Sequence, residues 1–444
     1  ATMVTAGVYM VARLNFLYAL SPTAMTVVAA TGALTALFAA TIGLFQHDIK
    51  KVLAYSTVSQ LGYMFIGVGV GAYWAGIFHL LTHAVFKALL FLGSGSVILG
   101  CHHEQDMRKM GGLKKYMPQT HWTYLFAAMA ITTAPVFLVS NGFFSKDEIL
   151  WKAFDASHLL IPGWILWLVG FVGAGLTSFY MWRSYYMTFT GDYRGGHADA
   201  HAHADAHHDD HGGHHASAPH ESPRTMTWVR VTLALLIKPT ALLGFWPLLH
   251  IEPLFEHWLH PVVGRASESL AWLSTTVATY GGLSMIGWEK LLAASSVVLA
   301  LGGFFFARWV YKDAKNPLPD RLLASRSALV TGAYRLIYNK YFVDELYDFL
   351  VVRRSRALAR LFYRFDQRVI DAFVDFVALV GRTFATFDGL IDTLIVDGAV
   401  NGVANGTAAL GRHVRRTQTG RIQTYLVGIV GGVLVLVVVN YVLF

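Results

Sequence analysis

Long apolar segments constrain this chain more than any other feature of its sequence. About nine of them approach the 20 residues that a helix needs to cross a bilayer. They span roughly residues 1–13 (a partial helix), 22–45, 52–71, 73–99, 122–155, 160–190, 227–249, 285–311 and 421–443. Only helices and closed barrels satisfy backbone polar groups in lipid, and runs this long exclude barrel strands. The sequence therefore predicts an all-α, polytopic transmembrane helical bundle.

The composition agrees with a membrane protein and argues against nucleic acid as a partner. Of the 444 residues 55% are hydrophobic and 14% are charged, whereas soluble domains carry about 25% charged residues. The net charge is +8, but Lys and Arg occur in short clusters between apolar runs and form no single basic face. Cys101 is the single cysteine, and no CxxC or zinc spacing accompanies it. We expect no redox centre, cofactor or metal site in this chain.

The positions of the basic clusters predict the orientation of the spans. Lys and Arg gather in alternate connections, near residues 50–51, 108–115, 194–224 and 312–321. Such connections face the cytoplasm, so the intervening ones should face the opposite side. Residue 1 is alanine, and ATMVTAGVYMVAR already has the character of a helix interior. We therefore expect an N-terminally truncated chain.

The bundle is interrupted by a histidine-rich loop at residues 192–226, which separates helices in 1–191 from two further transmembrane helices in 227–312. Nine histidines fall within residues 197–220. This tract is either a metal-binding segment or a disordered polar loop. No spacing in it resembles a closed tetrahedral ligand set, which favours the loop.

A long amphipathic helix is predicted in the region 313–420, from about Asp344 to Arg416. Apolar residues recur there every three or four positions: Val369, Phe373, Phe376, Val380, Phe384, Phe387, Ile391 and Leu394. At 1.5 Å per residue its length is on the order of 100 Å, although Gly381, Gly389 and Gly398 could interrupt it. We expect it to lie laterally along neighbouring subunits on the cytoplasmic face, with residues 421–444 as a C-terminal transmembrane anchor.

Three ionisable residues share one stripe of the span at 73–99. His79, His83 and Lys87 are spaced i, i+4 and i+8, which places them on one face of a helix. Ionisable groups at membrane depth usually mark a proton or ion pathway, and histidine both accepts and donates a proton near neutral pH. The alternative is hydrogen-bonded packing, with Lys87 reaching the membrane edge.

A second group of charges follows an interruption in the span at 122–155. Pro135, Asn141 and Gly142 precede Lys146 and Asp147, and transporters place ion sites at such broken helices. We predict that Lys146 is a proton carrier with Asp147 as its charged neighbour; the alternative is an ordinary ion pair at the water boundary. The polar residues Ser56 to Tyr63 suit water chains and interhelical hydrogen bonds equally well, and Lys238 has no assigned role.

Three stretches resemble the antiporter-like membrane subunits that complex I shares with multisubunit cation/proton antiporters and membrane-bound hydrogenases. They are DIKKVLAYSTVSQLGYM, FHLLTHAVFKALLFLGSGSVILGCHHEQDMRKMGGL and NGFFSKDEIL. The C-terminal region consists of NKYFVDELYD (339–348), the predicted long helix and the last span. It resembles the C-terminal region of the complex I members that have a long helix followed by a final span. The resemblance covers almost the whole chain.

The resemblance implies a proton-translocating subunit of NADH:quinone oxidoreductase, multi-pass in a bacterial inner membrane. It assigns His79, His83 and Lys87 to a central relay and Lys146, with Asp147, to proton exit. A further glutamate and lysine of the family would lie upstream of Ala1, so this part alone should not pump. NADH, FMN, iron–sulfur clusters and quinone would belong to partner subunits. The rival interpretations are a cation/proton antiporter or hydrogenase subunit and a purely structural membrane scaffold.

Overall fold

The protein is described from a computed structural model that covers residues 2–132, 141–195, 218–221, 223–245, 254–271, 279–280, 283–312, 324 and 327–443. The chain divides into two compact units, Ala1–Phe342 and Val343–Phe444. Pro135 and residues 197–217 of the histidine-rich tract lie outside the described residues.

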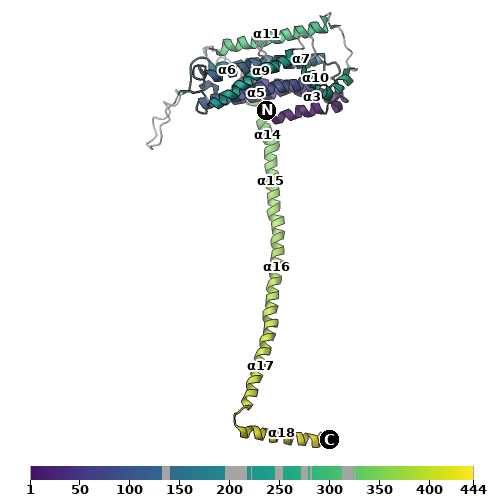
Figure 1. Ribbon diagram of the computed structural model, residues 1–444, viewed down its shortest axis with the longest axis vertical. Coiled ribbons are helices and arrows are strands. Elements are labelled where there is room, and N and C mark those ends of the chain that lie inside the picture. The colour runs from purple at the N-terminus through teal and green to yellow at the C-terminus, as the bar shows by residue number, and fades with distance from the viewer. Residues whose placement is uncertain are drawn as a thin grey trace. The chain divides into compact units, whose positions relative to one another are not determined.

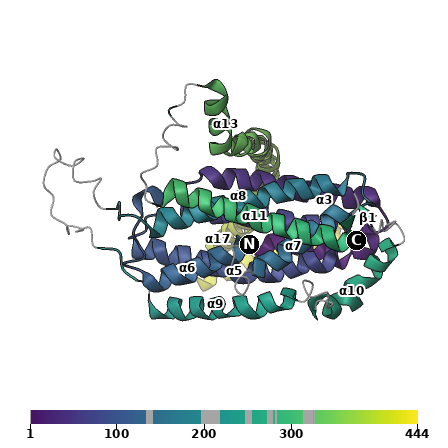
Figure 2. The same ribbon diagram turned by 90° about the horizontal axis from the view of Figure 1, so that it is seen from above.

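The first unit is a bundle of helices (Figures 1 and 2). Its helices are α1 (Thr2–Arg13), α2 (Asn15–Tyr18), α3 (Pro22–Phe45), α4 (Ile49–Gly69), α5 (Tyr73–Gly100), α6 (Pro118–Ile131), α7 (Asn141–Asp155), α8 (Gly163–Phe189), α9 (Arg224–Phe245), α10 (Leu254–Ala271), α11 (Met285–Tyr311) and α13 (Ala328–Tyr338). In the described part of the chain, six helices are long and apolar enough to cross a membrane: α3, α4, α5, α8, α11 and, in the second unit, α18 (Ile422–Leu443). The predicted all-α, multi-pass membrane fold is confirmed.

Local sequence explains where two of these helices begin. Ser21 caps α3 by accepting a hydrogen bond from the Ala24 amide at 3.2 Å, and Pro22 occupies the first helical position. Asp48 caps α4 by accepting from the amides of Lys50 and Lys51 at 2.8 and 3.2 Å. Side-chain acceptors at this position satisfy amides that have no partner within the helix. The lysines predicted to lie in a connection are thus the exposed first turn of α4.

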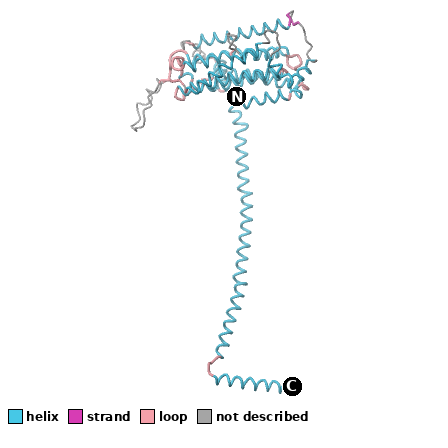
Figure 3. The backbone as a smooth tube through the Cα atoms, viewed as in Figure 1, coloured by secondary structure: helices cyan, strands magenta, loops and turns pink. Residues whose placement is uncertain are grey.

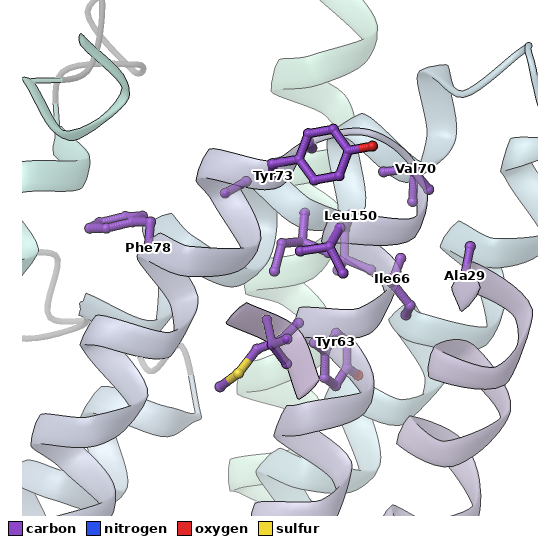
Figure 4. Close-up of a cluster of buried hydrophobic side chains, with 14 of the residues drawn as sticks. Ala29, Tyr63, Ile66, Val70, Tyr73, Phe78 and Leu150 are labelled. Atoms are coloured by element: carbon purple, nitrogen blue, oxygen red, sulfur yellow. The ribbon is translucent and has the colours of Figure 1, made fainter. Parts of the chain in front are cut away.

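Small residues bring α3 and α4 into backbone contact. A Cβ atom at Gly62 would lie 2.5 Å from the Ala36 nitrogen and 2.6 Å from the Gly32 oxygen. Ser59 crosses the same interface and donates to the Ala36 carbonyl at 2.8 Å. Close helix pairs of this kind are typical of membrane bundles. An apolar cluster that includes Ala29, Tyr63 and Leu150 packs between α3, α4, α5 and α7 (Figure 4).

Two connections differ from the sequence-based expectation. The connection predicted after residue 250 contains helix α10. This helix carries charged residues such as Glu256, so the hydropathy of the segment did not indicate a helix. Two antiparallel strands of two residues each, β1 (Thr279–Tyr280) and β2 (Leu283–Ser284), precede α11 (Figure 3).

The described residues of the span predicted at 122–155 form two helices, α6 and α7. The start of α7 lies against the end of α6, because a Cβ atom at Gly142 would overlap the Ala130 carbonyl oxygen.

The second unit consists of one long helical stretch and α18. The stretch comprises α14 (Val343–Tyr347), η4 (Asp348–Val352), α15 (Arg353–Phe365), η5 (Asp366–Ile370), α16 (Asp371–Ile391), η6 (Asp392–Val396) and α17 (Asp397–Thr417). The three η segments are π-helical turns. Helical structure continues through all three glycines that could have interrupted it. The apolar stripe is exposed along this unit, for example 66% at Phe373 and 70% at Phe384. Its lateral placement along neighbouring subunits remains a prediction.

Candidate functional site: a buried row of ionisable side chains

The stripe predicted on α5 faces the interior of the bundle. His79 is fully buried, and His83 and Lys87 are each 2% exposed. The rings of His79 and His83 are 6.4 Å apart between centroids. Helix α5 ends at Gly100, at the end of the bundle that carries Lys50, Lys51, Lys114 and Lys115, called here the basic end. Of the three residues of the stripe, Lys87 lies nearest to this end. The row therefore runs from Lys87, in the middle of α5, to His79, nearer to the opposite end of that helix.

His79 connects three helices through both of its ring nitrogens. Its Nδ1 lies 2.8 Å from the Ser145 hydroxyl of α7, and its Nε2 lies 3.1 Å from the Gln60 side-chain oxygen of α4. Because that oxygen only accepts, Nε2 donates to it, and Nδ1 is the ring nitrogen that shares a hydrogen bond with Ser145. The Thr82 hydroxyl is a further 2.8 Å from Ser145. Sequence reasoning missed Ser145, although it stands immediately before Lys146.

Lys146 is buried beside this group, at 2% exposure. Its ammonium lies 4.8 Å from the centre of the Tyr63 ring, close enough for a cation–π interaction. The Tyr63 hydroxyl donates to the Gly170 carbonyl at 2.5 Å, which holds the ring in place. Since Ser145 bonds His79, α7 brings Lys146 next to the α5 row.

Asp147 does not face Lys146. It is half-buried, and the Ser296 hydroxyl of α11 hydrogen bonds to it. Neighbouring residues on a helix point in different directions, which explains the divergence. Within the described residues Lys146 forms no ion pair, so the alternative of a Lys146–Asp147 pair at the water boundary does not match this geometry.

Lys87 does not reach the membrane edge. Its ammonium donates to the Leu53 carbonyl of α4 at 3.1 Å, and Thr57 donates to the same oxygen at 3.0 Å. A buried lysine held by a carbonyl dipole, with no carboxylate, is costly when charged. This environment makes gain and loss of its proton responsive to nearby charge.

Two buried arginines at the basic end were missed by the sequence analysis. Arg183 of α8 donates to the Gln46 carbonyl at 2.7 Å and contacts His47 Nδ1 at 3.1 Å. Burial, followed by the Arg183 charge, lowers the pKa of His47 from 6.5 to about 4. Arg183 thereby holds the short connection between α3 and α4 against α8. The sequence analysis missed both arginines because each lies within an otherwise apolar span.

The second arginine, Arg230 of α9, belongs to a network around Glu221. Glu221 accepts from the amide of Gln119 at 3.0 Å and from the Thr120 hydroxyl, at the start of α6. Arg230 lies 3.4 Å from the same carboxylate and donates to Ser96 of α5. This network fastens the segment that follows the histidine-rich tract to the ends of three helices.

Lys238, which has no assigned role, lies on α9 away from the buried row. Lys238 is exposed on α9 and borders a shallow groove of about 580 Å³ that also contains Trp122 and Trp228. Among the described residues no group of three or more His, Cys, Asp or Glu side chains is arranged to hold a metal ion.

The chain is similar in sequence to antiporter-like membrane subunits. Residues 1–177 match the family described as NADH:quinone oxidoreductase/Mrp antiporter, TM. The chain is 39% identical to NAD(P)H-quinone oxidoreductase chain 5 of Picosynechococcus sp. and 36% identical to NADH-quinone oxidoreductase subunit L of Neisseria meningitidis. Both alignments cover 98% of this chain and 59% of the relative. The chain is identified as a relative of subunit L, or chain 5, of NADH-quinone oxidoreductases, and it spans about three fifths of their length.

A solved structure supports the fold. The Mrp complex from Dietzia sp. aligns with a TM-score of 0.50 and 23% identity, over 88% of this chain and 36% of that chain. At this level of identity the similarity concerns the arrangement of helices alone.

Proposed function

We propose that the chain moves protons across the membrane as a subunit of NADH:quinone oxidoreductase. The observation that carries the proposal is the burial of Lys87, His83, His79 and Lys146 in one row, joined to α4 and α7 by side-chain hydrogen bonds. Ionisable groups inside a membrane are costly, so their presence there usually marks a proton or ion pathway. The identity of the relatives agrees with this function.

Protons would pass from Lys87 through His83 and His79 to Lys146. Two nitrogen atoms along this row, Gln60 Nε2 and His83 Nε2, are buried without a hydrogen-bond partner in the described protein. Buried polar groups are nearly always hydrogen-bonded, so a water chain along the row would satisfy them. The Ser145 hydroxyl, which is hydrogen-bonded to His79, would then pass a proton between His79 and water next to Lys146.

Redox chemistry would take place in partner subunits, because the proposed role of this chain needs only proton carriers. NADH, FMN, iron–sulfur clusters and quinone would bind there. The exposed apolar stripe of the α14–α17 stretch would contact neighbouring membrane subunits. We place the complex in a bacterial inner membrane, because the relatives include bacterial subunits and the basic connections follow the charge bias of cytoplasmic loops.

The experiment replaces Lys146 by alanine in the full-length chain of the assembled complex. Lys152→Ala is the matched control, because Lys152 lies on the same helix with its side chain 40% exposed and paired with Glu148 at 3.7 Å. NADH-driven acidification of membrane vesicles, measured per assembled complex, should be lost with Lys146→Ala and kept with Lys152→Ala. An assembled Lys146→Ala complex that pumps normally would leave only the structural scaffold.

A further inference from the structure

A series of buried hydroxyl groups follows α8 from the basic end of the bundle toward Lys87. It consists of three hydrogen-bonded pairs: His121 Nε2 with the Tyr185 hydroxyl at 2.7 Å, the Tyr124 hydroxyl with Ser184 Oγ at 3.1 Å, and the Tyr180 hydroxyl with Ser56 Oγ at 2.9 Å. We call these six residues the hydroxyl series. Each pair joins α8 to either α6 or α4.

The hydroxyl series leads from the surface into the interior. His121 lies in the first turn of α6 and is partly exposed, whereas Tyr124, Ser184, Tyr180 and Ser56 are fully buried. Ser184 and Tyr180 are four residues apart on α8, which corresponds to about 6 Å along the helix axis. The first two pairs are spaced along α6 instead, where His121 and Tyr124 are three residues apart. Each gap between consecutive pairs is thus about one helical turn along one of the joining helices, and the route proposed below needs a water molecule in each gap.

The inner end of the hydroxyl series lies close to Lys87. Ser56 is three residues after Leu53 on α4, about 4.5 Å along the axis. The Leu53 carbonyl is the group that receives the Lys87 ammonium at 3.1 Å. The series and the proposed relay thus meet within one turn of α4.

The pairing pattern differs from that of ordinary packing hydroxyls. Thr123, on α6 between His121 and Tyr124, donates to its own helix at the Gln119 carbonyl, 3.0 Å away, which is how an isolated hydroxyl is satisfied in a membrane helix. The three pairs instead bond side chain to side chain between helices, a minority class of protein hydrogen bonds. Groups paired in this way both accept and donate, as a proton relay requires.

We propose that the hydroxyl series is the uptake branch that delivers protons from the basic side of the membrane to Lys87. The proposal rests on the proposed function. His121 takes a proton from water on one ring nitrogen and releases one from the other. Each hydroxyl then accepts a proton on an oxygen lone pair and gives up its own to the next group, and finally Lys87 binds the proton. The hydroxyls rotate back, so every group except Lys87 returns to its starting charge.

Tyr180→Phe and Tyr124→Phe test the proposal in the complete complex, since each keeps the ring and removes only the hydroxyl. Tyr73→Phe is the control: Tyr73 is equally buried, but its hydroxyl contacts the Asn15 carbonyl at 3.4 Å at the opposite end of α5. The initial rate of NADH-driven acidification per assembled complex should fall at least about tenfold in the two test variants, in line with the contribution of positioned proton-transfer groups. The control should pump at the wild-type rate.

A pH profile on the basic side separates proton delivery from bundle packing. Burial, followed by the charge of Lys114, lowers the pKa of His121 below its ordinary value. His121→Gln should therefore remove the component of the pumping rate that titrates on the acidic side of that value, whereas a packing defect would lower the rate equally at every pH. Where a tyrosine variant fails to assemble, Ser184→Ala gives the same readout with a smaller change. Wild-type pumping by Tyr180→Phe and Tyr124→Phe overturns the uptake branch; combined with loss of pumping in Lys146→Ala, it leaves the proposed function intact.

Discussion

The contact between α3 and α4 makes Gly62→Ala a sharp test of the structure. The added Cβ would lie 2.5 Å from the Ala36 nitrogen and 2.8 Å from its Cα, whereas carbon atoms in contact are normally about 3.5–4.0 Å apart. Because these are backbone atoms, no side chain can rotate away. The two helices would have to separate by about 1 Å.

The expected cost follows from three contributions. Overpacking typically destabilises a core by about 1–3 kcal/mol. Separation also strains the bond from Ser59 to the Ala36 carbonyl, a net loss of about 1 kcal/mol if it breaks. The better helix propensity of alanine returns about 1 kcal/mol. The free energy of unfolding should therefore fall by about 1–3 kcal/mol, which lowers the melting temperature by roughly 2–4 °C per kcal/mol.

Cys101 provides the assay. It is the single cysteine of the chain and is 4% exposed, and burial raises the pKa of its thiol to about 11. A thiol-reactive dye should therefore label the detergent-purified chain only as the bundle opens. Gly95→Ala is the control, since nothing lies within 4 Å of a Cβ there; it should melt at or above the wild-type temperature. If both variants melt together, the close approach of α3 and α4 is wrong.

Two further predictions concern the basic end. Glu221→Gln removes the charge that faces buried Arg230 at 3.4 Å. Removing one partner of a buried ion pair costs about 3–5 kcal/mol. We reduce this to about 1–3 kcal/mol because the Glu221 side chain is 24% exposed and Arg230 also donates to Ser96 and Thr227. Thermal unfolding checks the loss, and an unchanged melting temperature would contradict it. The pKa of His47 is lowered to about 4, so the unfolded chain binds the proton first, and wild-type stability should decline as pH falls from about 6.5 toward 4. His47→Gln should flatten this decline in melts at pH 7, 6 and 5, whereas parallel curves would refute the assignment.

Local geometry explains why much of this protein is readable from sequence. The apolar runs had to be helices because lipid offers no hydrogen bonds to the backbone. The i, i+4, i+8 spacing placed His79, His83 and Lys87 on one stripe before any packing was known. Pro135, Asn141 and Gly142 predicted a break before Lys146 in the same way, and residues 133–140 lie outside the described part of the chain. The sequence missed α10, because its charged residues resemble those of a loop.

Tertiary structure alone decided what these groups contact. Ser145 and Gln60 reach His79 from positions 66 and 19 residues away in the chain, and the Leu53 carbonyl reaches Lys87 across 34. Asp147 follows Lys146 directly, yet it faces α11. Helical periodicity is a property of consecutive residues, so a sequence displays it. Which side chains of different helices form hydrogen bonds depends on how closely the two backbones approach. Glycines such as Gly32 and Gly62 allow a close approach, but that distance exists only once the helices have packed.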